Sequence, residues 1–126
     1  MESFPLFLAG AWDDGEGTLD VHSPWDGSVV ARTARAGPRE LELAAEAALT
    51  AFEQSRRSPA WQRSELLERV ARLLEEQAET FARALVGEAG KPIRLARAEV
   101  ARGVHTLKCA AALSLRGELL PLDTAT

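Results

Sequence analysis

A histidine and a cysteine spaced for nucleophilic chemistry occur together once in this sequence, at His105 and Cys109. In a helix, residues four positions apart share one face, so the imidazole could act as a base toward the thiol. A catalytic thiolate needs such a base or a helix N-terminus to lower its pKa. Cys109, however, lies in the middle of a helical stretch and is followed by three alanines. We therefore interpret the pair as neighbours on a helix surface and predict no catalytic residue here.

Metal-ligating residues are also sparse. A structural zinc site needs four closely grouped ligands, whereas His22, His105 and Cys109 are the only histidines and cysteine in the chain and are scattered along it. We predict no metal site.

Two glycine-containing segments could suggest a phosphate cradle. A Walker A loop that included Gly90-Lys91 would need glycine where Leu85 stands and serine or threonine where Pro92 stands. The Gly-x-Gly of residues 15–17 lacks the third glycine of a dinucleotide fingerprint, and no helical pattern follows it. The sequence therefore predicts a turn at residues 15–17 and no cofactor-binding residue in either segment.

The first third of the chain has the alternation and turn residues of β-structure. One strand is predicted over Leu6–Trp12, a second over Thr18–His22 and a third over Ser28–Thr33. Residues 13–17 and 23–27 contain the Asp, Gly and Pro residues typical of turns and should connect them.

From Pro38 the apolar spacing becomes helical. A first helix should begin at Pro38 and end by Ser55, and its predicted apolar face consists of Leu41, Ala44, Ala45, Ala48 and Phe52. A second helix should begin with Ser58 as N-cap and Pro59 in its first turn. Its apolar stripe contains Leu66, Leu67, Val70, Leu73, Leu74, Ala78, Phe81 and Leu85.

The opposite face of this second helix is charged. It carries three Glu-to-Arg pairs at i,i+4 spacing, Glu65–Arg69, Glu68–Arg72 and Glu79–Arg83, which indicates a solvated surface.

A third helix should run from Ile93 to a stop at Gly117. Its predicted face consists of Val100, Val104, Leu107, Ala111 and Leu115. The three tryptophans, Trp12, Trp25 and Trp61, are expected to cover the edges of the core.

The amino-acid composition excludes several classes of protein. The 126 residues are 46% hydrophobic and 27% charged, as in one soluble domain or a piece of a larger one. A single cysteine excludes a disulfide scaffold, and no run reaches the roughly 18 apolar residues of a membrane span. No signal peptide is predicted, so the cytoplasm is the expected location. The net charge of -4 makes nucleic acid and anionic membranes unexpected partners.

The order of several short motifs is more informative than any one residue. An apolar strand ending in Gly10-Ala11-Trp12 precedes a Ser-Pro-Trp-Asp-Gly turn at residues 23–27. Trp61 with Arg63, the segment Glu88–Pro92, and Gly117-Glu118 with Pro121 follow. This order resembles the amino-terminal portion of the aldehyde dehydrogenase superfamily, in which Asn usually stands at the position of Ser23.

One branch of that superfamily is the most similar. The form Glu-Ala-Gly-Lys-Pro-Ile at residues 88–93, followed by Arg97, Glu99-Val100 and Arg102, resembles the branch acting on lactaldehyde, phosphonoacetaldehyde or, without phosphorylation, glyceraldehyde-3-phosphate. The closing Leu-Pro-Leu-Asp at residues 120–123 agrees with that branch.

The resemblance implies a reaction and a fold. Enzymes of this family oxidise an aldehyde to a carboxylic acid with NAD or NADP: a cysteine adds to the carbonyl, hydride passes to the nicotinamide, and a glutamate activates water. In the family those groups, the oxyanion asparagine and the nucleotide site lie downstream of the residues present here, and Cys109 does not match the nucleophile's motif. The resemblance therefore assigns no catalytic, cofactor-binding or metal residue to this sequence, and the 126-residue chain alone is expected to be inactive.

The expected fold class is α+β, a fragment of the α/β aldehyde dehydrogenase fold without its central Rossmann-type sheet. Residues 1–126 would form the amino-terminal part of the cofactor-binding domain, with strands and turns in 1–37, three helices in 38–117 and an exit segment in 118–126. The expected partner is the rest of such a polypeptide or a homo-oligomer. The alternative is a non-enzymatic helical module that docks on an oligomeric partner through the Leu66–Leu85 stripe.

Overall fold

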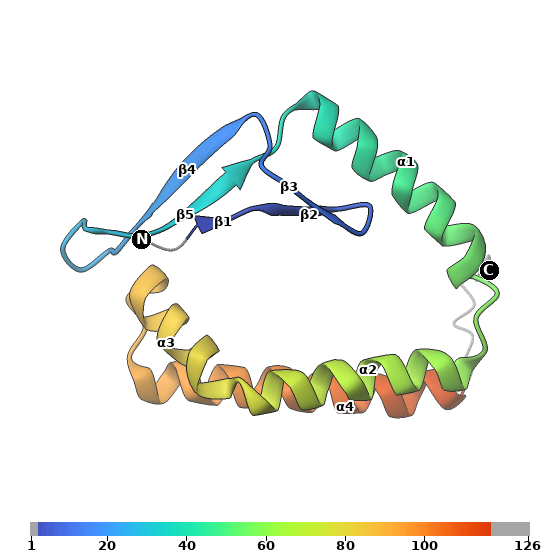
Figure 1. Cartoon of the computed structure of the whole chain (residues 1–126). Helices are drawn as coiled ribbons and strands as arrows, with labels where there is room; N and C mark the ends of the chain where they lie inside the picture. Colours follow the sequence, from blue (N-terminus) through green and yellow to red (C-terminus); the bar gives the residue numbers. More distant parts are fainter. Residues whose placement is uncertain (1–2, 117–126) are drawn as a thin grey trace, which may run out of the picture. The chain divides into compact units, whose positions relative to one another are not determined.

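The computed structural model describes residues 3–116, in which strands precede helices (Figure 1). The α+β organisation expected from the sequence is confirmed. The strands are β1 (Ser3–Phe4), β2 (Leu6–Leu8), β3 (Ala11–Asp13), β4 (Gly17–His22) and β5 (Val29–Arg35). The helices are α1 (Pro38–Ser55), α2 (Ala60–Glu76), α3 (Ala78–Ala89) and α4 (Ile93–Arg116).

The first predicted strand is a hairpin of two strands, so the single strand over Leu6–Trp12 was wrong. Ala9 and Gly10 have φ values of 50° and 84°, and positive φ at both central residues is the geometry of a tight type I′ turn. The turn pairs Phe7 with Trp12 across β2 and β3, and their ring centroids lie 4.9 Å apart. Because alanine rarely adopts positive φ, the sequence pattern does not reveal this turn.

The second sheet has the strand order β1-β5-β4. β4 pairs antiparallel with β5 from Gly17 opposite Arg35 to Val21 opposite Ala31, and a bulge follows Val21. β1 adds a short parallel edge on the other side of β5. These strands confirm the predicted segments Thr18–His22 and Ser28–Thr33 to within two residues at each end.

The turn between β4 and β5 is closed by its own polar groups. The backbone amide and the hydroxyl of Ser28 donate to Asp26 Oδ1 at 3.0 and 2.7 Å, and the Gly27 amide donates to the carbonyl of Ser23 at 2.9 Å. The hydrogen bonds from Ser28 hold the pKa of Asp26 below its ordinary value. The predicted turn at residues 23–27 is therefore confirmed.

The chain divides into two compact units. The first contains residues 3–57 and Arg83–Ile93, and the second contains Ser58–Ala82 and residues 94–116. Within the first unit α1 lies against β2. Its side facing the strands includes Glu40, Leu43, Ala44 and Ala47, whereas Leu41 and Phe52 of the predicted face are exposed.

The predicted second helix is divided into α2 and α3, so residues 3–116 contain one helix more than the three expected. Gln77, between them, has φ -104° and ψ 16°, outside the helical region. Its amide still bonds to the carbonyl of Leu73 at 3.2 Å, and its own carbonyl accepts from Phe81 at 3.1 Å. Because hydrogen bonding continues through the bend, the apolar stripe keeps its spacing and gives no sign of the break.

One helix start differs in detail from the sequence interpretation. Ser58 is not the N-cap of α2: Pro59 holds that position with an extended backbone, and its carbonyl accepts from the Gln62 amide at 3.1 Å. α1 ends at Ser55 as expected. The predicted stop at Gly117 and the exit segment 118–126 lie outside the described residues.

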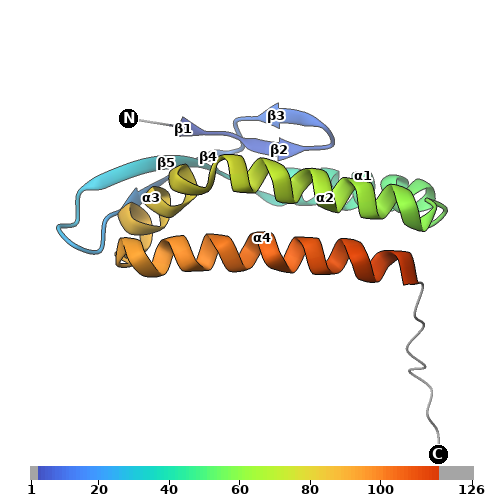
Figure 2. The same cartoon turned by 90° about the horizontal axis from the view of Figure 1, so that it is seen from below.

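In the second unit α2 and α4 run side by side (Figure 2). Small side chains line their contact: Ala71 is fully buried, and Ala96, Val100, Val104 and Ala111 of α4 are buried as well. Small residues allow two helices to approach closely, but no large side chain is fully buried anywhere in residues 3–116. No helix among these residues is long and apolar enough to cross a membrane.

Candidate functional site

The structure brings His105 and Cys109 together on α4. Cys109 Sγ lies 3.5 Å from His105 Nε2, and both side chains are exposed. A nucleophilic cysteine with a histidine base also needs a third group that orients the histidine. Within residues 3–116 no carboxylate hydrogen-bonds to His105, so this orienting group is missing from the described chain. The pair also lies in the middle of a helix rather than at its positive N-terminal end. The arrangement offers a surface thiol and no assembled catalytic group.

Residues 3–116 contain no group of three His, Cys, Asp or Glu side chains placed to hold an ion. His22, the third candidate, lies on β4, and its Nδ1 is 3.0 Å from the carbonyl of Gly27 in the adjacent turn.

The glycines of residues 15–17 serve the backbone rather than a nucleotide. Gly15 has φ 67°, and a Cβ at this position would collide with the carbonyl of Arg35. That carbonyl accepts the Glu16 amide at 3.0 Å. Close approach to β5 therefore explains this glycine, and the segment leads into β4 instead of a helix N-terminus. Residues 15–17 thus lack the helix N-terminus of a dinucleotide-binding turn.

The Gly90-Lys91 step ends α3. Gly90 has φ 63°, and its amide donates to the carbonyl of Val86 at 3.0 Å, which is a helix C-terminus closed by a left-handed residue. A Cβ on Gly90 would lie only 2.8 Å from Pro24 Cγ, so close packing within the first unit also favours glycine here. Pro92 then separates α3 from α4.

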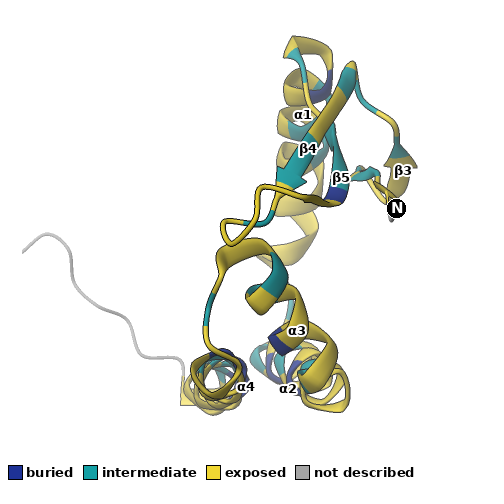
Figure 3. Ribbon diagram, turned by 90° about the vertical axis from the view of Figure 1, so that its left-hand side faces the viewer, coloured by how far each residue is buried: buried dark blue, intermediate teal, exposed yellow. Residues whose placement is uncertain are grey.

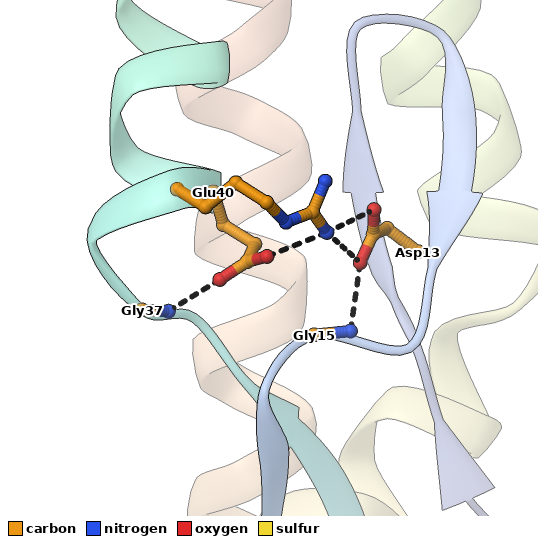
Figure 4. Close-up of polar contacts among 5 residues, drawn as sticks. Asp13, Gly15, Gly37 and Glu40 are labelled. Carbon is orange, nitrogen blue, oxygen red and sulfur yellow. Dashed lines mark hydrogen bonds and ion pairs between the residues drawn. The ribbon is translucent and has the colours of Figure 1, made fainter.

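The N-terminus of α1 is occupied by a side chain of the protein itself (Figure 4). Glu40, 3% exposed, accepts the Gly37 amide at 2.7 Å on Oε2. This is half of a capping box, because glycine has no side chain to return the bond. Arg39 Nη2 lies 2.6 Å from Glu40 Oε1. An external anion would therefore have to displace Glu40 to reach the Gly37 amide.

Asp13, at the end of β3, completes this cluster. It accepts the Gly15 amide at 2.7 Å on Oδ1, and Arg39 Nη2 lies 3.1 Å from its Oδ2 (Figure 4). The bond from Gly15, and then the Arg39 guanidinium, hold the pKa of Asp13 below its ordinary value. Asp13 raises the pKa of Arg39 in turn. We call Asp13, Arg39 and Glu40 the β3–α1 cluster.

The sequence interpretation missed the β3–α1 cluster. A glutamate three residues after Gly37, at the start of a helical pattern, is the sequence signal of a capping interaction and could have indicated Glu40. No local signal indicated Asp13, since it lies 26 positions before Arg39. The cluster fixes the entry into α1 and contains no nucleophile.

Ion pairs between α4 and the two preceding helices stabilise the second unit. Arg97 makes two bonds of 2.9 Å to Glu79, which raise the pKa of Arg97, and Lys108 Nζ lies 2.8 Å from Glu75 Oε2. Glu79 of the predicted charged face therefore pairs with α4, and so does Glu75, which the prediction did not name.

Large apolar side chains remain exposed in both units. The tryptophans expected to cover the core edge are instead open, with Trp12 70%, Trp25 92% and Trp61 58% exposed. Burial in Figure 3 is confined to a few small positions, and most of the helical surface is exposed. Trp12 lies against the ring of Phe7, but most of its surface stays exposed.

Comparison with known proteins identifies the segment. Residues 12–125 match the family model described as "Aldehyde dehydrogenase family". An aldehyde-dehydrogenase-like protein of Sinorhizobium fredii is 39% identical over 86% of this chain and 22% of its own length. The 3-sulfolactaldehyde dehydrogenase of Pseudomonas putida is 36% identical over 94% and 25%. The lactaldehyde dehydrogenase of Methanocaldococcus jannaschii is 32% identical over 94% and 26%.

Solved structures agree with these relatives. Aldehyde dehydrogenase 21 of Physcomitrella patens, in complex with succinate, matches 99% of this chain with a TM-score of 0.88 at 34% identity. A NAD-dependent benzaldehyde dehydrogenase of Corynebacterium glutamicum matches 98% with a TM-score of 0.85 at 28% identity. The matches cover 27% and 28% of those chains. The chain therefore spans about a quarter of the length of the proteins it matches.

Proposed function

The chain belongs to the aldehyde dehydrogenase family, and we propose that it forms the amino-terminal segment of an enzyme that oxidises an aldehyde to a carboxylic acid with NAD or NADP. The observation that carries the proposal is the match of nearly the whole chain to about a quarter of the Physcomitrella patens enzyme. We place this enzyme in the cytoplasm.

In this proposal the described residues supply structure rather than chemistry. Residues 15–17 lead into β4 rather than into a helix, and no carboxylate of the described residues bonds to His105 beside Cys109, so we assign no step of the reaction to them. The catalytic and cofactor-binding groups are contributed by the rest of an aldehyde dehydrogenase polypeptide. The 126-residue chain by itself is inactive.

An activity assay tests the inactivity. The purified chain is mixed with NAD or NADP and a panel of small aldehydes, and reduced cofactor is followed by its absorbance. We expect no turnover above that of buffer, and the same result for Cys109→Ala. Turnover that disappears in Cys109→Ala would assign the catalytic thiol to this chain and overturn the proposal.

A second candidate function is a non-enzymatic module that docks on an oligomeric partner. The exposed side chains of Leu66, Val70, Leu73 and Phe81 favour it, since they form an apolar surface without a catalytic group. The two candidates differ in the partner: the first requires the remainder of an aldehyde dehydrogenase, and the second an unrelated protein.

A further inference from the structure

We draw no further inference here: the strongest candidate, the apolar groove between the hairpin of β2 and β3 and the alanine side of α1, carries none because nothing in the part of the chain that the structure describes shows what covers it.

Discussion

Arg39, in the first turn of α1, holds the carboxylate of Asp13 at the end of β3, with Nη2 3.1 Å from Oδ2 (Figure 4). Arg39 also contacts Glu40, and Glu40 accepts the amide of Gly37, the N-cap residue that precedes the helix. One guanidinium thus ties the hairpin to the start of α1.

Removing the charge of Asp13 should destabilise the first unit. Asp13→Asn keeps the shape of the side chain and an oxygen for the Gly15 amide, but loses the ionic attraction to Arg39. We expect a lower melting temperature at neutral pH, measured by circular dichroism. Asp14→Asn is the control, since Asp14 is exposed and makes no hydrogen bond to another described residue. An equal loss in both variants would contradict the role of the β3–α1 cluster.

Acid should lower the stability of the folded chain by protonating three carboxylates, those of Asp13, Asp20 and Asp26. Their pKa values are lowered in the folded state. Arg32 is the main cause for Asp20. A lowered pKa means that the ionised form stabilises the fold, so this contribution is complete above the ordinary value of 3.8 and is lost as pH falls through the lowered values. The melting temperature should fall between about pH 5 and about pH 2. The melting temperature of Asp13→Asn should fall less steeply with decreasing pH than that of the unsubstituted chain. An identical slope would refute the contribution of Asp13 to the acid sensitivity.

Two glycines, Gly87 inside α3 and Gly90 directly after its end, should respond to alanine in opposite directions. Gly90 has φ 63° and no room for a Cβ beside Pro24, so Gly90→Ala should destabilise the chain by about 1–2 kcal/mol or more. Gly87 lies inside the helix with open space around it, so Gly87→Ala should stabilise by about 0.5–1 kcal/mol. Denaturant unfolding of the two variants measures both effects. Stabilisation by Gly90→Ala would show that the left-handed end of α3 is not required.

The close approach of α2 and α4 should not tolerate a larger residue. Ala71 is 0% exposed, so Ala71→Leu inserts three carbon atoms into a filled contact and should cost about 1–3 kcal/mol in the free energy of unfolding. Ala101→Leu makes the same change at an exposed position of α4 and should have little effect. Equal stability of the two variants would mean that the helices are not tightly packed at Ala71.

The purified chain should associate with itself. Large apolar side chains on both units are exposed, including Leu41, Phe52, Leu66 and Leu73. Such surfaces promote contacts between molecules when nothing covers them. Sedimentation velocity should therefore show an average mass that increases with concentration. A clean monomer with sharp cooperative unfolding would contradict this expectation.

The periodicity of the sequence by itself determined the α+β organisation, the limits of α1 and the start of α4. It also indicated a turn at residues 23–27 and the absence of a Walker A loop at Gly90. These features are local: each depends on the spacing of apolar residues or on a proline or glycine acting within a few positions. The order of motifs further indicated the aldehyde dehydrogenase family, which the comparisons confirm.

Only the tertiary structure decided which of several apolar faces is buried. Leu66 and Leu67 look alike in the sequence, but the covered side of α2 is the one that contains Ala71, because small residues allow α4 to approach. The bend at Gln77 and the turn at Ala9 were hidden because neither changes the apolar spacing. The contact between Asp13 and Arg39 required the fold, since it joins residues 26 positions apart and no local preference encodes such a distance.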